Sequence, residues 1–366
     1  MRVTFVLPNW EGNLAGGIRA NVTLAYHLQK RGHEVQLYCP KKRSPGWKQR
    51  IKNWLKGKGW NGRQTRFSYV EEVDIPAIVV NHLPPLRDED LPDADVVVAT
   101  WWETAEWVAG LSRSKGAKVY MVRHHEVHDY LPKERAAATY GLPLHKVTVS
   151  RWLVEVMRRE YGDENVDLVP DAVDLRQFYA PPRGKNEIPT VGLMYSDIYW
   201  KGCDISLTAF RIAAERIPSL RLVAFGTIPP LPRLPLPTKC VYYRLPPQDE
   251  IRNIYAQCDA WLFGSRVEGF GLPILEAMAC RTPVIGTPAG AAPELLSKGG
   301  GILVKPENPE DMARAIEEIV QMSQQEWQKM SSLAYKTATS YTWDEAAELF
   351  EKALCRAIER TRKGEI

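Results

Sequence analysis

Short apolar runs alternate with amphipathic stretches along nearly the whole chain of 366 residues. The first group of predicted strands comprises residues 3–7, 35–38, 77–80, 96–99, 119–122 and 146–149, with predicted helices at 21–30 and 152–161. The second group comprises strands at 190–194, 221–225, 241–243, 260–263, 283–286 and 302–304, with helices at 204–216, 248–257, 273–279 and 309–322. Alternation of this kind predicts a parallel sheet covered by helices. Because it occurs twice, we expect an α/β protein with two Rossmann-like, doubly wound domains.

The composition fits two domains in a reducing compartment. A length of 366 residues with 45% hydrophobic residues is enough for two cores. No uninterrupted apolar run reaches the roughly 18 residues of a transmembrane helix, and the first run resembles a buried strand rather than a signal peptide. The six cysteines lack C-x-x-C spacing, so we expect neither a metal cluster nor a disulfide framework. A cytoplasmic location is therefore predicted.

The most informative motif is the run from Glu268 to Ala279. It follows a predicted strand, contains Gly269 and Gly271, and continues into a helix opened by Pro273. The N–H groups at such a helix start bind anions, and glycines let the backbone approach a ligand. Glu268 and Glu276 add carboxylates that accept hydrogen bonds from hydroxyls. The motif predicts a site for a sugar, a diphosphate and a ribose; the alternative is a solvated loop carboxylate and a helix acid favoured by the dipole.

These residues resemble the donor-binding signature of family 4 glycosyltransferases (glycosyl transferase group 1), which have the two-domain GT-B fold. The resemblance covers nearly the whole chain and rests on segments that occur in a fixed order. They are Met1–Pro8 with Gly16-Gly17, Arg31–Val35, Val169–Asp174 with Phe178, Lys201-Gly202, Ser265–Gly286 with Gly290 and Glu294, and Tyr341-Thr342-Trp343.

The resemblance implies a particular domain order. Residues 1–183 form an N-terminal acceptor-binding domain, residues 184–342 form a nucleotide-sugar-binding domain, and the helix in 343–366 crosses back to the first domain. The two Rossmann-like domains are expected to face a central cleft.

The resemblance also implies a function. The chain is expected to be a retaining, metal-independent glycosyltransferase that moves a sugar from a UDP-, GDP- or dTDP-sugar to a glycan, lipid-linked or small-molecule acceptor, in surface polysaccharide or glycoconjugate synthesis. No cofactor beyond this nucleotide-sugar co-substrate is expected. One alternative is a phosphorylase- or epimerase-like enzyme of the same fold. Another is a catalytically silent, sugar-nucleotide-binding subunit of a polysaccharide-assembly complex.

By the same resemblance, Glu276 binds ribose hydroxyls and Glu268 lies near the hydroxyls of the transferred sugar. Lys201 offsets the charge that develops on the leaving diphosphate; the alternative is an ordinary surface lysine. The loop that presents backbone N–H groups to the sugar and diphosphate consists of Gly269, Phe270, Gly271 and Leu272. Gly16 and Gly17 are expected to close over the phosphates.

One position departs from the family pattern. Members of the family commonly carry an arginine about six residues before the lysine, where this chain has Tyr195 and Ser196. These side chains donate hydrogen bonds but supply no permanent charge. Either another arginine takes its place, with Arg19 as our candidate, or the diphosphate is held less tightly.

A histidine cluster follows the predicted strand at 119–122. Its sequence, His124-His125-Glu126-Val127-His128, does not have the glutamate spacing of a helical zinc hydrolase. By the resemblance, His124 or His125 contacts the transferred sugar or supports the reacting centre, and Glu126 binds acceptor hydroxyls. The alternatives are structural hydrogen bonding and a metal site.

The segment from Lys41 to Arg66 is strongly basic. It carries ten lysines and arginines and no acid, so the remainder of the chain sums to 4 − 10 = −6. One helical face would hold Trp47, Ile51, Trp54 and Leu55, with Lys48 among the flanking basic residues. This pattern is typical of a helix at an anionic membrane surface, which suits a peripheral enzyme on the inner face of the plasma membrane. The alternative is a basic loop that contacts an acidic glycan; nucleic-acid binding is not expected.

Overall fold

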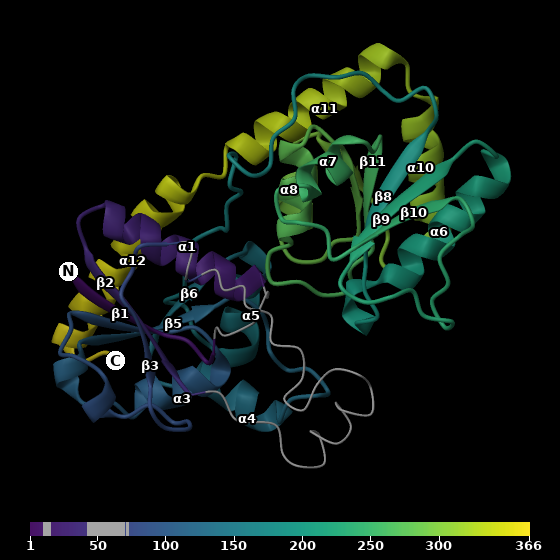
Figure 1. Cartoon of the computed structure of the whole chain (residues 1–366). Coiled ribbons are helices and arrows are strands. Elements are labelled where there is room, and N and C mark those ends of the chain that lie inside the picture. Colours follow the sequence, from purple (N-terminus) through teal and green to yellow (C-terminus); the bar gives the residue numbers. More distant parts are fainter. Residues whose placement is uncertain (10–15, 42–69, 71–72) are drawn as a thin grey trace. The chain divides into compact units, whose positions relative to one another are not determined.

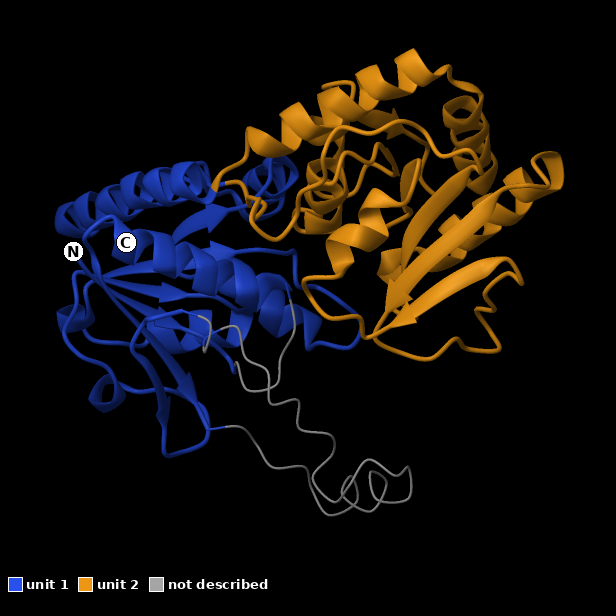
Figure 2. Cartoon of the chain, turned by 45° about the horizontal axis from the view of Figure 1, so that its top comes forward, with its two compact units in different colours: residues 1–169, 343–366 blue, residues 170–342 orange. Residues whose placement is uncertain are grey.

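The computed structural model describes residues 1–9, 16–41, 70 and 73–366 and consists of two compact units. Unit 1 comprises Met1–Val169 with Trp343–Ile366, and unit 2 comprises Pro170–Thr342 (Figure 2). Unit 1 is therefore discontinuous in sequence, and unit 2 is inserted into it.

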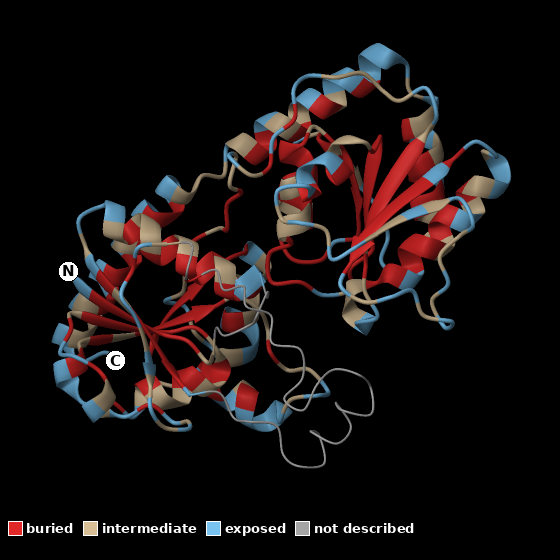
Figure 3. Ribbon diagram, viewed as in Figure 1, coloured by how far each residue is buried: buried red, intermediate tan, exposed pale blue. Residues whose placement is uncertain are grey.

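Unit 1 is built on a seven-stranded parallel sheet with strand order β3-β2-β1-β4-β5-β6-β7 (Figure 1). The strands are β1 (Arg2–Val6), β2 (Glu34–Pro40), β3 (Ala77–Val80), β4 (Val96–Ala99), β5 (Ala117–Val122), β6 (His145–Thr148) and β7 (Asp167–Leu168). The inner strands β1, β4 and β5 are mostly apolar and buried because helices cover both faces (Figure 3), whereas the edge strands β3 and β7 are partly exposed. The order reverses between β1 and β4, which makes the carboxyl ends of these strands the topological switch point.

The helices of unit 1 lie on both faces of this sheet. They are α1 (Gly16–Lys30), α3 (Trp102–Ala109), α4 (Lys133–Ala138), α5 (Arg151–Tyr161) and α12 (Trp343–Lys363). Helix α12 packs against α1 and β5 (Figure 1). Phe350 of α12 is fully buried, with its ring centroid 6.0 Å from that of Phe5. Arg31, directly after α1, donates to Glu351 of α12 at 2.6 Å, so a polar contact at the rim also joins these two parts of the unit.

Unit 2 contains a six-stranded parallel sheet with order β10-β9-β8-β11-β12-β13. The strands are β8 (Thr190–Tyr195), β9 (Arg221–Gly226), β10 (Cys240–Arg244), β11 (Ala260–Phe263), β12 (Val284–Gly286) and β13 (Gly301–Leu303). The order reverses between β8 and β11. A side chain at Gly192 of β8 would overlap the ring of Trp261 on β11, so the two central strands fit only with glycine there.

Helices again cover both faces in unit 2. They are α6 (Cys203–Arg216), α7 (Ile251–Ala256), α8 (Leu272–Ala279), α9 (Ala292–Leu296), α10 (Pro309–Gln321) and α11 (Gln324–Thr339). Helices α6 and α10 pack together on one face, and α8 packs with α7 and α11 on the other (Figure 1). The core between the sheet and α6 and α10 includes Phe210, Ile316 and Trp327.

The predicted fold class, two parallel-sheet α/β domains, is confirmed. The helices α3, α4, α9 and α11 were not predicted. Residues on both sides of the predicted boundary between 183 and 184 are bonded into unit 2. Arg183 donates to the carbonyl of Cys258, and Asp259 accepts the N–H of Asn186 at 2.8 Å. Unit 2 accordingly begins at Pro170, before the predicted start at residue 184.

Candidate active site

Two loops meet at the switch point of unit 2, one after β8 and one after β11. The first ends at Gly202, which has φ +56°, and a Cβ there would overlap the carbonyl oxygen of Gly264 in the second. The backbone N–H of Arg266 donates to Trp200 O at 2.8 Å. This close approach, which only glycine allows, brings Lys201 beside Glu268. Ligands of open α/β sheets bind at such switch points.

Lys201 and Glu268 form a two-pronged ion pair. The Lys201 ammonium donates to Oε1 and Oε2 of Glu268 at 2.8 and 2.9 Å. Ser265 Oγ also donates to Glu268 Oε1, at 2.8 Å. The Glu268 side chain is 8% exposed and that of Lys201 is 24% exposed, so solvent reaches the cation more than the anion. An ammonium has three N–H donors, so Lys201 can contact Glu268 and an additional anion together.

Arg266 fixes the outer side of these loops. Its guanidinium donates to both carboxylate oxygens of Asp204, at 2.9 and 2.8 Å, and to Tyr199 O at 2.7 Å. The same group lies over the Tyr199 ring, 4.1 Å from its centroid, and contacts Glu307. Arg266 therefore has structural partners on the loop after β8, on α6 and before α10.

Helix α8 begins at the end of the second loop. Gly271 precedes it with φ +103°, a conformation that favours glycine, and Pro273 stands in its first turn. A Cβ at Gly290 would collide with the Phe270 carbonyl oxygen, so the β12–α9 segment also lies close against the loop. Gly269, Phe270 and Gly271 are buried and Leu272 is partly buried.

Glu276 lies one turn inside α8 and is partly buried. Tyr255 of α7 donates its hydroxyl to Glu276 Oε2 at 2.8 Å. Burial, reinforced by the neighbouring Glu276 charge, raises the pKa of Tyr255 well above its usual value, so the hydroxyl keeps its proton and acts as a donor. The two glutamates of the motif are thus each oriented by a hydroxyl donor.

Tyr195 was predicted to donate a hydrogen bond to the diphosphate, but its hydroxyl is directed elsewhere. It is the last residue of β8 and is buried, and its hydroxyl donates to Leu234 O while accepting from Leu231 N, both at 2.8 Å. The side chain points into the core between the sheet and α6, so its hydrogen is not directed at a diphosphate. Ser196 is partly buried and accepts from Ile198 N at 3.3 Å. Next to it, Asp197 pairs with Arg233 at 2.9 Å.

In unit 1, the predicted phosphate-closing glycines Gly16 and Gly17 are exposed and begin α1. Arg19 is partly buried on the same helix. The side chain of Arg123 at the end of β5 lies near Gly17 and donates to Asn21 at 2.6 Å. Arg123 was not predicted, although it directly precedes the histidine cluster; it places a second cation at the α1 terminus.

The histidine cluster forms a group of rings after β5. His125 contacts the Tyr161 hydroxyl at 2.7 Å, and burial lowers its pKa. His124 and His128 have ring centroids 4.7 Å apart, and His128 stacks on the exposed Tyr130. The rings contact one another rather than converge on one point. Among the described residues, no group of three or more His, Cys, Asp or Glu side chains could hold a metal ion.

Glu126 is buried, with 5% exposure, although we predicted that it would contact acceptor hydroxyls. Its carboxylate accepts the Trp102 N–H at 3.3 Å, at the start of α3, and its own N–H donates to the Tyr140 hydroxyl at 2.8 Å. Burial raises the pKa of the Glu126 carboxyl well above its usual range. These contacts place Glu126 inside unit 1 rather than on its surface.

The basic segment with Trp47, Lys48, Ile51, Trp54 and Leu55 lies outside the described residues. In the part of the chain that is described, no helix is long and apolar enough to cross a membrane.

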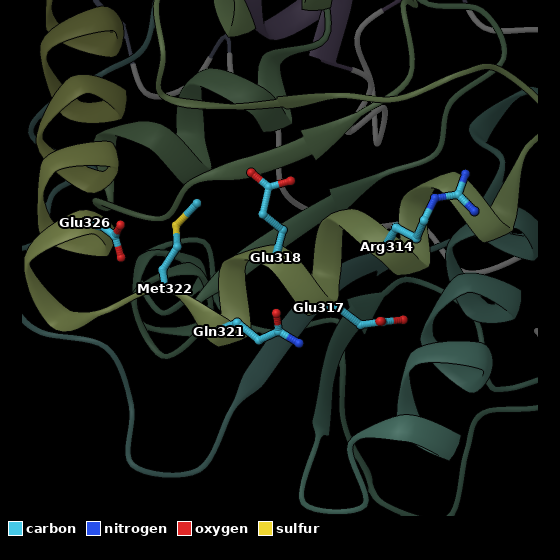
Figure 4. A pocket seen from close by; sticks show the side chains of 6 residues that line it. All are labelled: Arg314, Glu317, Glu318, Gln321, Met322 and Glu326. Carbon is cyan, nitrogen blue, oxygen red and sulfur yellow. The ribbon is translucent and has the colours of Figure 1, made fainter.

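A separate surface pocket lies on α10 and the start of α11 (Figure 4). It contains no residue of the predicted site and is lined by Arg314, Glu317, Glu318, Gln321, Met322 and Glu326.

Comparison with known proteins defines the class. The fold is similar to the crystal structure of Anabaena Alr3699/HepE in complex with UDP and glucose, with a TM-score of 0.73 and 17% identity over 97% of this chain and 99% of that one. The chain therefore has the GT-B fold. Residues 174–337 match the family described as Glycosyl transferases group 1. Unit 2 is thus a group 1 glycosyltransferase domain, as the sequence resemblance predicted.

The curated relatives match smaller parts of the chain than the Anabaena structure does. One of the subunits of human phosphatidylinositol N-acetylglucosaminyltransferase is 26% identical over 55% of this chain, and the match covers 43% of that protein. The MMP alpha-(1->4)-mannosyltransferase of Mycolicibacterium hassiacum is 23% identical over 78% of this chain and 68% of its own length. The chain thus spans less than half the length of the human relative.

Proposed function

We propose that the protein is a retaining glycosyltransferase that uses a nucleotide-diphosphate sugar as donor. The observation that carries this proposal is the Lys201–Glu268 pair, set at the switch point of unit 2 beside the glycine-capped start of α8. Glu276 on the same helix supplies a second oriented carboxylate. A cation, the peptide N–H groups of a helix start and two oriented carboxylates suit a diphosphate flanked by two polyhydroxylated rings.

Each residue has a proposed role. Glu276 accepts hydrogen bonds from the ribose, Glu268 accepts from the transferred sugar, and the N–H groups of residues 269–272 face the sugar and diphosphate. Lys201 offsets charge on the leaving diphosphate while keeping its contact with Glu268. Gly16, Gly17 and Arg19 of unit 1 are proposed to complete the phosphate contacts, and His124 and His125 to support the reacting centre.

The proposed reaction takes place on one face of the sugar. The bond between the anomeric carbon and the diphosphate oxygen breaks, and the acceptor oxygen bonds to that carbon from the same side. The acceptor hydroxyl proton passes to the leaving phosphate oxygen. Because the acceptor attacks from the same face, the reaction needs no carboxylate nucleophile, and because the leaving oxygen takes the proton, it needs no separate base. The positioned cation stabilises the charge that develops.

Several observations support the choice of substrates. The Anabaena structure contains UDP and glucose, and the curated relatives are named as transferases of mannose or N-acetylglucosamine. We propose a glycan, lipid-linked or small-molecule acceptor in surface polysaccharide or glycoconjugate synthesis. The ten basic residues of segment 41–66 support a peripheral position on the inner face of the plasma membrane.

The proposal is tested with purified protein and a panel of UDP-, GDP- and dTDP-sugars, in which release of the nucleoside diphosphate is followed with time. We expect slow hydrolysis of at least one donor in the absence of an acceptor. Tight nucleotide binding without turnover, either alone or with crude acceptor lipids and glycans, would contradict the enzyme and favour the silent binding subunit.

Replacing the cation tests its role directly. Lys201→Ala should lower kcat by about 100-fold or more, because one positioned donor to a developing oxyanion is worth about 3 kcal/mol. Lys239→Ala is the matched control, since Lys239 is an exposed lysine of the same unit whose ammonium donates to Pro218 O at 2.5 Å. Wild-type turnover by Lys201→Ala would remove Lys201 from the proposed chemistry.

A further inference from the structure

Tyr255 is a fully buried tyrosine whose hydroxyl contacts a residue of the proposed donor site. Its ring centroid lies 4.4 Å from that of Trp261, 5.7 Å from Phe225 and 6.1 Å from Phe178. Aromatic rings therefore hold it on several sides. Its hydroxyl donates to Glu276 Oε2 at 2.8 Å. The side chain thus joins the rigid core of unit 2 to a partly buried carboxylate.

This contact has a chemical consequence for Glu276. A glutamate side chain has three rotatable bonds, and on a helix surface it samples many positions. A hydrogen bond from an immobile hydroxyl fixes one carboxylate oxygen and so limits the orientation of the whole group. A carboxylate accepts up to about four hydrogen bonds, so it can still receive others from a ligand. The carboxylate is held in place before any nucleotide arrives.

We propose that Tyr255 is a positioning residue that orients Glu276 toward the ribose diol, and that the site therefore selects ribonucleotide donors over 2′-deoxyribonucleotide donors. This inference rests on the proposed function and narrows it, because it favours UDP- or GDP-sugars over dTDP-sugars. The physical basis is preorganisation. A carboxylate that is already fixed toward the ribose loses little orientational freedom when it accepts the hydroxyls, whereas a mobile carboxylate must be ordered first, which weakens binding of the ribonucleotide alone.

The test measures dissociation constants by calorimetry for UDP and 2′-deoxy-UDP, and for GDP and 2′-deoxy-GDP. Wild-type protein should bind the ribonucleotide of its preferred base at least about tenfold more tightly than the deoxy form, the effect of one hydrogen bond to a charged group. In Tyr255→Phe this ratio should fall severalfold. The loss should be confined to the ribonucleotide, with the deoxy affinity unchanged within about twofold.

A matched control separates positioning from folding. The hydroxyl of Tyr242, another tyrosine of unit 2, donates to the backbone oxygen of Ile228. Tyr242→Phe should leave the ribose-to-deoxyribose ratio unchanged. An unchanged deoxy affinity in Tyr255→Phe shows that the site itself is intact.

The outcomes are distinguishable. If wild-type protein bound neither these nucleotides nor dTDP, the proposed donor site would be contradicted, and this inference with it. If it bound dTDP alone, or ribo and deoxy forms equally, ribose selection would be wrong while the transferase proposal stood. If Tyr255→Phe kept the full wild-type ratio, or weakened both forms equally, Tyr255 would have only a structural role.

Discussion

The Lys201–Glu268 ion pair is better explained by function than by stability. Ion pairs that solvent reaches contribute only about 0–1 kcal/mol, and Lys201 is 24% exposed. The pair nevertheless has an added donor, because Ser265 also contacts Glu268. A carboxylate held by two donors is fixed in orientation, which matters where a sugar hydroxyl must be met at a defined angle.

Ser265→Ala tests this orientation. The change removes one donor to Glu268, and we expect kcat/KM to fall by about tenfold, the effect of one hydrogen bond to a charged group. The melting temperature should change little. Ser297→Ala, at an exposed serine of the same unit, is the control. Equal kcat/KM for Ser265→Ala and wild type would show that Lys201 alone orients Glu268.

Glu126 makes the stability of unit 1 depend on pH. Its folded-state pKa is raised, so the folded state binds a proton more tightly than the unfolded state does. This contribution favours folding below the ordinary glutamate pKa and is lost as pH rises above it. Glu126→Gln should therefore be more stable than wild type at pH 8, and the difference should shrink toward about pH 4.5.

Thermal unfolding of both proteins across this pH range measures the effect. Glu134→Gln, at an exposed glutamate of α4, should show no such trend. A difference that stayed constant with pH would mean that Glu126 does not titrate differently in the folded protein.

For single residues, the sequence predicted which residues belong to the candidate site better than it predicted whether their side chains are buried. Glu268 and Glu276 were identified from the motif and Lys201 from the family resemblance, and Lys201 and Glu268 form an ion pair. Glu126 and Tyr195 were expected to face ligands but are buried. Whether a side chain after a strand points to solvent or to a neighbouring helix depends on tertiary packing, which local sequence does not encode. For the same reason Tyr255 gave no signal, since its partner is 21 residues away.

Among the secondary-structure elements, the strands were predicted most accurately. Continuous apolar runs of strand length are distinctive, and every strand listed from the sequence overlaps an observed one. Helix α11 was missed although Ser323 and Glu326 form a capping box at its start. Helix α3 was missed because apolar residues occur around much of its circumference, so no amphipathic period is visible.

The contact between the two site loops depends on Gly202. A Cβ at this position would overlap Gly264 O, and φ is +56°. Gly202→Ala should therefore separate the loops, lower activity strongly, and cost about 1–3 kcal/mol of unit 2 stability. Activity and denaturant unfolding measure the two effects.

Gly162→Ala is a matched control for Gly202→Ala. Gly162 also has a positive φ, +67°, but a Cβ there meets nothing within 4 Å. This variant should show only the cost of the backbone conformation and should keep its activity. If Gly202→Ala behaved like Gly162→Ala, the close approach of the loops would not be needed for the site.

On the scale of the whole molecule, α12 completes unit 1. The helix buries Ala346, Phe350 and Leu354 against the rest of the unit. Arg356 donates to Asp167, whose carboxylate also contacts the buried His145 at 2.8 Å. The family resemblance indicated both a helix in residues 343–366 and the domain that it would join.

Phe350→Ala should destabilise unit 1 by about 3–5 kcal/mol, because it leaves a cavity beside Phe5. The neighbouring Leu349 is 40% exposed, so Leu349→Ala should cost less than about 0.5 kcal/mol. Denaturant unfolding of both variants measures the difference. Equal stability of the two would mean that α12 contributes little to the core of unit 1.

The insertion of unit 2 into unit 1 has a consequence for synthesis on the ribosome. Residues 170–342 separate the sheet of unit 1 from its last helix. At about 5–20 residues per second, translating this stretch takes roughly 10–30 s. During that time the nascent sheet has no α12 to cover it, so an apolar surface is available to molecular chaperones or to neighbouring nascent chains. Unit 2, which is contiguous, can fold before the unit that began to emerge first.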